Sequence, residues 1–241
     1  MPYGPRPAGE VIAFTREAVR WLARWDCKLI VLACNTATSV ALEQVREESP
    51  VPVLGVIRPG AAAAIASSAR RAVGVLATAG TVRSGAYVRA IRDLDPLADV
   101  VQQACPKLVP LVESGRADSD EAESAIREYL GPLLADGAVV SPAVDTILLG
   151  CTHYPLLRER IAKVAGPSVR VVDSAATTAL AVREVLESHR LLRSAGTPPE
   201  HRVFATGPVE RFEEVARTIF GREGDLPPVE RADLAEGAAA R

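Results

Sequence analysis

The chain has 241 residues, of which 48% are hydrophobic and 24% charged, a balance typical of a globular protein with a substantial core. Its formal net charge is -2 at pH 7, so no positive excess predicts nucleic acid or an anionic membrane as the main partner. No apolar run of 18 residues predicts a membrane span, and the first residues form no hydrophobic signal segment. We therefore expect a cytoplasmic protein that binds neither nucleic acid nor membrane.

Strands and helices alternate along the sequence. The first half predicts a helix at 8–25, a strand at 28–33, a helix after Cys34 that runs through Ala41, Leu42 and Val45, a strand at 53–57, an Ala-rich helix near 61–71 opened by Pro59-Gly60, a strand at 73–77, a helix near 83–94 and a strand near 99–103. The second half predicts a helix at 118–136, a strand at 146–150, a helix at about 155–165, a strand at 169–172, a helix at 175–191, a strand at 202–205, a helix at 208–220 and a disordered end at 236–241.

This alternation predicts parallel sheets in an α/β fold. The strand at 28–33 is a short apolar run, as expected for a strand buried on both faces. Residues 29–36 also resemble residues 146–153, because each segment is an apolar strand followed by a small residue, Cys and a polar helix start. The repeat predicts two similar lobes. Ligands of open α/β sheets bind beyond the carboxyl ends of the strands, so two facing lobes would place one Cys on each side of a shared cleft.

The four cysteines are too widely spaced to form a zinc or dithiol motif. Cys27 and Cys105 are expected to be small buried apolar residues, and structural disulfides are not expected in a reducing cytosol. Cys34 and Cys151 differ because each lies just before a predicted helix.

A thiol before a helix can supply acid-base chemistry, because the helix N-terminus stabilises the thiolate and lowers its pKa. One thiolate and one thiol on opposite faces of a stereocentre could remove a proton and return another, which is a two-base racemisation. His153 could tune the proton affinity of Cys151. The alternative, at this point equally good, is that Cys34 and Cys151 only pack at strand ends.

Six strings in the sequence resemble bacterial glutamate racemase, in the same order and over nearly the whole chain. They are PYGPR at 2–6, ACNTA at 33–37, VLGVIRPG at 53–60, TAGTVRSGAY at 78–87, CPKLVPLVE at 105–113 and GCTHYP at 150–155. The last string is specific, whereas related racemases share the second. Relatives that act on aspartate usually carry Glu where this chain has His153, which favours glutamate.

The resemblance implies two similar parallel-sheet lobes related by pseudo-two-fold symmetry, with the active site in the cleft between them. Lobe one would comprise residues 1–58 and 172–235, and lobe two residues 59–171. The implied activity is interconversion of L- and D-glutamate without cofactor or metal, which supplies D-glutamate for peptidoglycan. Family members are often dimers, so a homodimer is a further expectation.

The resemblance also implies the site residues. Cys34 would act on D-glutamate and Cys151 on L-glutamate, while Asn35, Thr36 and Thr152 would hold the substrate carboxylates. The remaining residues would be Tyr3 and Gly4 from the loop before the first helix, Thr78 and Thr81 from lobe two, and Glu113 with His153 as a polar pair near Cys151. The alternatives are an ordinary helix cap for the two threonines of lobe two and a solvated carboxylate for Glu113.

The sequence departs from the family at its start. In the family, a strand ending in Asp-Ser-Gly and a helix precede the Pro-Tyr-Gly string, which here begins at Pro2. Neither Asp118-Ser119, in a predicted helical surface segment, nor Asp173-Ser174, which matches another family position, replaces that pair. We therefore expect an open sheet edge and weak or no activity for this chain, and we favour a misassigned start over a damaged protein.

Two other functions remain open. The first is a racemase of the same superfamily that acts on aspartate or a hydantoin, against which His153 and Tyr154 argue. The second is a truncated, non-enzymatic binding protein.

Overall fold

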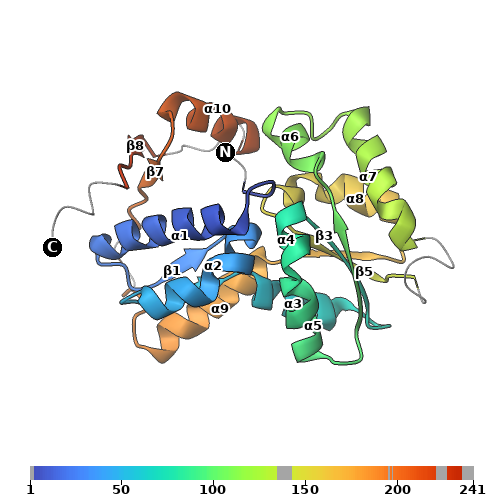
Figure 1. Cartoon of the computed structure of the whole chain (residues 1–241), viewed down its shortest axis with the longest axis horizontal. Helices are drawn as coiled ribbons and strands as arrows, with labels where there is room; N and C mark the ends of the chain where they lie inside the picture. Colours follow the sequence, from blue (N-terminus) through green and yellow to red (C-terminus); the bar gives the residue numbers. More distant parts are fainter. Residues whose placement is uncertain (1–2, 135–142, 195, 197, 221–226, 235–241) are drawn as a thin grey trace.

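The computed structural model describes residues 3–134, 143–194, 196, 198–220 and 227–234. Figure 1 shows two bodies side by side, one built from the middle of the chain and the other mainly from its two ends. All strand pairs in the described residues are parallel, which confirms the predicted α/β class. The expected disordered end at 236–241, and the last two residues of the helix expected at 118–136, lie outside the described residues.

Lobe two is organised around a four-stranded sheet. Its order is β4 (Asp99–Ala104), β3 (Ala72–Ala77), β5 (Thr146–Gly150) and β6 (Arg170–Asp173). The two central strands, β3 and β5, are buried along their whole length, as their continuous apolar runs predict. The register pairs Ala77 with Gly150, so the residues that follow these two strands emerge at the same edge of the sheet.

Helices cover both faces of this sheet. One apolar cluster includes α3 (Ile57–Ser67) and α5 (Ala86–Leu94), and the other includes α6 (Leu108–Glu113), α7 (Asp120–Leu134) and α8 (Arg158–Ala165). Along β5, Leu148 belongs to the first cluster and its neighbours Ile147 and Leu149 to the second, because successive side chains point to opposite faces. This double cover fixes the sheet edge from which the second predicted cysteine emerges.

Lobe one contains shorter strands. β1 (Ile30–Leu32) pairs with β2 (Val53–Gly55), and β7 (Val203–Ala205) pairs with β8 (Val229–Arg231). Helices α1 (Ala8–Leu22) and α2 (Asn35–Glu48) pack together, followed along the chain by α9 (Ala175–Ser188) and α10 (Val209–Phe220). The short 3-10 segment η1 (Ala23–Trp25) extends α1, so the helix predicted over 8–25 is confirmed with a tighter last turn.

The β1 edge is open, as the sequence predicts. β1 pairs with β2 on one side, and no other described strand pairs with it. The prediction that this strand is buried on both faces is wrong, because Val31 between buried Ile30 and Leu32 is 37% exposed. Only one face of β1 packs against the small core of lobe one.

Two predicted helices have different ends in the structure. The helix expected near 61–71 starts at Ile57, because Pro59 is its third residue and the missing N–H of a proline costs nothing in a first turn. The helix expected near 83–94 is two helices, α4 (Ala79–Ser84) and α5. They separate at Gly85, whose φ of 65° ends the first helix in the left-handed region.

Smaller differences concern segment ends and missed elements. α7 starts at Asp120, since the Ser119 hydroxyl accepts a hydrogen bond from the Ala122 N–H, so Asp118-Ser119 lies before the helix. The helix expected at 155–165 opens with a 3-10 turn, η2 (Tyr154–Leu157). Helix α6 and strand β8 are absent from the sequence-based prediction, and β6 runs to Asp173, beyond the expected lobe boundary at residue 171.

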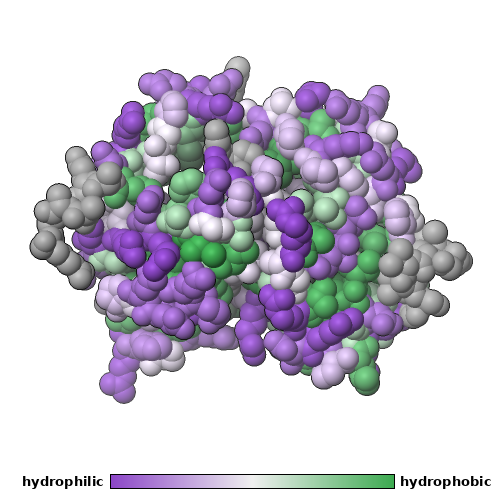
Figure 2. All heavy atoms as spheres, in the orientation of Figure 1, coloured by the Kyte–Doolittle hydropathy of each residue, from purple (hydrophilic) through white to green (hydrophobic). Residues whose placement is uncertain are grey.

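One face of the molecule is mainly polar (Figure 2). Figure 2 shows a mostly hydrophilic face with apolar areas on both lobes. No helix in the described part of the chain is both long and apolar enough to span a membrane.

Candidate active site

Cys34 lies at the junction between β1 and α2. It is the residue before α2 and has an extended conformation, with φ of -76° and ψ of 122°, so it lies next to the free N–H groups of the first helical turn. Burial raises the pKa of the thiol, whereas the N–H groups of Ala37 and Thr36 and the Thr36 hydroxyl oppose that rise by stabilising the thiolate. The helix start therefore provides the expected donors.

Cys151 follows β5 in the other lobe. It is buried, and burial raises the pKa of its thiol to about 12, although the N–H groups of His153 and Tyr154 favour the thiolate. A negative charge on Cys34 raises the pKa of Cys151 further, so the two sulfurs are close enough to interact electrostatically. The structure thus brings Cys34 and Cys151, 117 residues apart in sequence, to the same region between the lobes.

The expected net lowering of the thiol pKa values is wrong. At both cysteines burial is the largest cause, and it outweighs the favourable helix-start N–H groups. Removing a thiolate from water costs more free energy than a few backbone N–H groups provide by stabilising its charge. Both groups are therefore thiols in most molecules at neutral pH.

Three threonine hydroxyls join the lobes beside Cys34. Thr36 Oγ1 on α2 lies 2.9 Å from Thr78 Oγ1 and 3.2 Å from Thr81 Oγ1, and the latter two are 3.1 Å apart. Thr78 also caps α4 by accepting a hydrogen bond from the Thr81 N–H at 3.3 Å. A helix cap and a residue that faces the cleft are therefore compatible roles for Thr78, because it follows β3 and caps α4 while its hydroxyl reaches Thr36 of the other lobe.

Asn35 forms a second link between the lobes. Its Oδ1 accepts a 2.5 Å hydrogen bond from the Tyr87 hydroxyl, and both residues are buried. Burial is the main cause of the raised pKa of Tyr87, and a charge on Cys151 adds to it, so this phenol lies near the second cysteine. Tyr87 is not among the site residues predicted from the sequence. Its signal would have been the need of a buried phenol for a hydrogen-bond partner.

The N-terminal loop contacts lobe two through two glycines. The Gly4 carbonyl accepts a 3.0 Å hydrogen bond from the Gly80 N–H. The Tyr3 ring stacks on Phe14 with centroids 6.2 Å apart, and its pKa is raised, first by burial and then by the nearby Cys34. Tyr3 thus lies near Cys34, and Gly4 contacts the start of α4.

Substituting Gly80 with Ala should loosen this lobe contact. The added Cβ would lie 2.9 Å from the Gly4 carbonyl oxygen and 3.1 Å from the Thr36 methyl, and a backbone oxygen cannot move aside cheaply. We expect a loss of about 1–3 kcal/mol in the free energy of unfolding, measured by urea denaturation. Gly131→Ala is the matched control, because nothing lies within 4 Å of its Cβ in α7, and it should stabilise by up to about 1 kcal/mol. Equal stability for the two variants would refute the close approach.

Glu113 and His153 form the expected polar pair next to Cys151. His153 Nε2 lies 3.2 Å from Glu113 Oε1, and His153 Nδ1 lies 3.8 Å from the Cys151 sulfur. Glu113 ends α6 and His153 precedes η2, so two elements of lobe two hold the row of three side chains. The interpretation of Glu113 as an isolated, solvated carboxylate is therefore wrong, although 29% of its side chain remains exposed.

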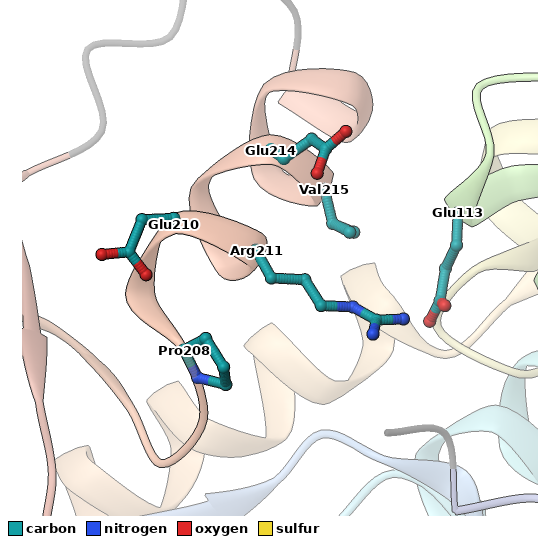
Figure 3. Close-up of a pocket in the computed structure, with 6 residues that line it drawn as sticks. All are labelled: Glu113, Pro208, Glu210, Arg211, Glu214 and Val215. Carbon is teal, nitrogen blue, oxygen red and sulfur yellow. The ribbon is translucent and has the colours of Figure 1, made fainter.

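A cavity of about 550 Å³ opens beside this row of side chains. It is lined by Glu113, Pro208, Glu210, Arg211, Glu214 and Val215. Figure 3 shows that all but Glu113 come from α10 and the residue before it, so the cavity lies between α10 and the end of α6. Helix α10 had no assigned role in the sequence analysis.

Some predicted residues stay apart from these contacts. Thr152 is exposed, and no hydrogen bond joins it to another predicted site residue in the described part of the chain. Cys105 is buried as expected, whereas Cys27 is only partly buried against the lobe-one core. Within the described residues, no group of three or more His, Cys, Asp or Glu side chains could hold a metal ion.

Comparison with known proteins places this geometry among amino-acid racemases. The model of a family described as Asp/Glu/Hydantoin racemase matches residues 6–182. A glutamate racemase of Lactiplantibacillus plantarum is 44% identical over 225 residues, which is 92% of this chain and 80% of that protein.

Solved structures agree. A glutamate racemase isoform of Bacillus anthracis superposes with a TM-score of 0.88 at 37% identity, over 97% of this chain and 84% of that one. A glutamate racemase of Francisella tularensis in complex with D-glutamate gives a TM-score of 0.86 at 26% identity, over 98% of this chain and 85% of that one. This chain is therefore similar to these proteins over nearly all of its own length.

Proposed function

The chain belongs to the Asp/Glu/hydantoin racemase family, and on that basis we propose that it interconverts L- and D-glutamate with Cys34 and Cys151 as its two bases. The observation that carries the proposal is the pairing of two cysteines from different lobes, each supplied with N–H donors by the segment that follows it. The glutamate racemases to which the chain is similar, including one solved with D-glutamate, support glutamate as the substrate. The product D-glutamate would serve peptidoglycan synthesis.

The reaction needs one thiolate and one thiol. The Cys34 thiolate would take the α-proton of D-glutamate, and the Cys151 thiol would give its proton to the opposite face of the resulting carbanion. The products are L-glutamate, a Cys34 thiol and a Cys151 thiolate, so protons and charge balance. The reverse reaction starts from the opposite protonation state. His153, held by Glu113, would assist proton movement at Cys151.

Polar groups around the sulfurs would hold the substrate. Asn35, Thr36 and Thr152 would bind its carboxylates, with Thr78 and Thr81 facing them from lobe two and Tyr3 and Gly4 closing the site. We also propose that the chain divides into a lobe of residues 1–58 and 172–235 and a lobe of residues 59–171. Strand β6 spans the boundary between them and pairs with β5 in the sheet of the second lobe. A cytoplasmic homodimer remains our expectation for the assembly.

Solvent exchange at the α-carbon tests the function directly. In D2O, with enough protein and time to detect the weak activity expected from the sequence, both enantiomers of glutamate should exchange the α-hydrogen for deuterium and racemise, as followed by NMR and circular dichroism. D-aspartate should exchange far more slowly. Faster exchange of aspartate than of glutamate would favour the aspartate alternative. An absence of exchange with every amino acid tested would contradict the proposal and favour the non-enzymatic binding protein.

Inhibitors test the absence of a cofactor. Chelators and carbonyl reagents should not inhibit, because the chemistry is assigned to two thiols. Alkylation of thiols should inhibit, and glutamate should slow it by covering the site. Loss of activity on exhaustive dialysis, restored by pyridoxal phosphate or a divalent metal, would contradict this proposal.

A further inference from the structure

Helix α10 reaches across from lobe one to lobe two. It packs against α6, and the Thr218 methyl lies 3.3 Å from the point where a Cβ on Gly115, just after α6, would stand. Its sequence neighbours β7 and β8 belong to lobe one. A segment of one lobe therefore covers the end of the helix that carries Glu113.

Arg211 is the cation of the cavity between these two helices. Figure 3 shows its side chain extending from α10 toward Glu113, while Glu210 points to the opposite side. Arg211 is exposed and makes no ion pair within 4.0 Å in the described part of the structure. Glu113 uses Oε1 for His153, and its other oxygen has no hydrogen-bond partner among the described residues. The guanidinium thus faces a carboxylate with a free acceptor, the pairing that arginine geometry favours.

We propose that Arg211 is a positioning residue that controls how strongly Glu113 holds a proton on His153, next to Cys151. The catalytic role of Arg211 rests on the proposed function. Its electrostatic effect on His153 rests only on the positions of Arg211, Glu113 and His153. A guanidinium near Glu113 offsets the negative charge of the carboxylate and disfavours a positive charge on the His153 imidazole. Arg211 belongs to α10, so a residue of lobe one would act on the acid-base group of lobe two.

The other charges around the pair do not replace Arg211. The charged residues that line the cavity with it are Glu113, Glu210 and Glu214, and all three are acidic. From the elements packed against α6, the Tyr129 hydroxyl of α7 accepts from the Lys107 N–H and the Tyr154 hydroxyl of η2 donates to the Cys105 carbonyl. Lys107, just before α6, is paired with Glu128 of α7 at 2.6 Å, and Cys34, Tyr87 and Cys105 are further titratable groups that interact electrostatically with Cys151.

Histidine NMR on the full chain provides the test, because the chain has only three histidines. The His153 resonance is assigned with His153→Asn. Arg211→Gln should move the titration midpoint of the His153 imidazole upward by about 0.3–1 pH unit at low salt, because a repelling charge is removed. Arg211→Lys should restore most of the wild-type midpoint. The effect should shrink near 0.5 M salt, where exposed charges are screened.

Two controls make the outcome decisive. Arg217→Gln removes an arginine from the same helix that pairs with Glu213 at 3.0 Å, and it should leave the His153 titration unchanged. In a Glu113→Gln background, Arg211→Gln should shift the titration less, because only the direct repulsion between Arg211 and His153 is left and the part that acts through the Glu113 carboxylate is gone. An unchanged midpoint in Arg211→Gln, or an equal shift in Arg217→Gln, would overturn the proposal.

Kinetics then connect the residue to turnover. The pH profile of kcat/KM should move in the same direction as the His153 titration in Arg211→Gln, which a purely structural loss would not produce. If the titration shifts but the wild-type chain racemises no amino acid, the proposed function fails and the electrostatic role of Arg211 stands. If the wild type racemises glutamate and the titration does not shift, the role of Arg211 alone is refuted.

Discussion

Cys34→Ser and Cys151→Ser should each lower the rate of glutamate racemisation by about 10²–10⁴-fold, the usual cost of removing a positioned acid or base. A serine hydroxyl has nearly the shape of a thiol but is a far weaker acid, so the fold is kept while the proton transfer is lost. The rate is measured with each enantiomer separately, by circular dichroism on purified full chains. Thermal unfolding of each variant establishes that it is folded.

The matched controls are the other two cysteines. Cys27 is partly buried, with its thiol 3.2 Å from the Leu22 carbonyl, and Cys105 is buried with its thiol 3.4 Å from the Gln103 carbonyl. A serine at either position can donate to the same carbonyl, so turnover should stay within a few-fold of wild type. If Cys27→Ser were as damaging as Cys34→Ser in a folded protein, the assignment of the two bases would be wrong.

Thermodynamics sharpens this test. Two enantiomers have the same free energy in water, so the ratio of kcat/KM in the two directions must stay at one for every variant. A loss confined to one direction in kcat/KM would therefore indicate an assay error. A useful asymmetry is hydrogen exchange without inversion. If Cys34 alone removes the proton of D-glutamate, Cys151→Ser should still exchange the α-hydrogen of D-glutamate faster than it racemises it.

The sequence predicts much of this fold because its signals are local. The apolar runs of β3 and β5 mark strands buried on both faces, and the repeat of strand, Cys and helix predicts the two lobes. The same rule fails for β1, since burial on both faces depends on what covers the strand, and Val31 is 37% exposed. Gly85 splits a predicted helix because its left-handed backbone is a single-residue feature inside a helical pattern.

The site shows the same division between local and distant information. The threonine contacts and the Glu113–His153 pair fall on residues that the motifs single out. Tyr87 was missed because its partner Asn35 lies 52 residues away and no periodicity connects the two. Arg211 was missed because Glu113, which it faces across the cavity, is 98 residues away. The predicted direction of the thiol pKa shifts was also wrong. A sequence reveals the helix that follows a cysteine, but not the burial whose effect on the pKa is larger.

Those pKa shifts predict a steep dependence of racemisation on pH. Because burial raises the pKa of Cys34 and raises that of Cys151 to about 12, most molecules carry two thiols at neutral pH. The reaction needs one of the two as a thiolate. At pH values below both thiol pKa values, the fraction of molecules with one thiolate grows tenfold with each pH unit. We therefore expect kcat/KM to rise by about 10–100-fold between pH 6 and 8.

The coupling between the sulfurs extends this rise toward alkaline pH. A thiolate at Cys34 raises the pKa of Cys151, so the second proton leaves only well above the first, and the form with one thiolate and one thiol persists over a wide range. The measurement is kcat/KM for both enantiomers at half-unit steps from pH 6 to 8.5, with the stability of the fold checked at each step. The two profiles should coincide, as the equal free energies require. A profile that stays flat across this range would mean that one thiolate is already formed at pH 6, and that N–H donors and His153 outweigh burial at that cysteine.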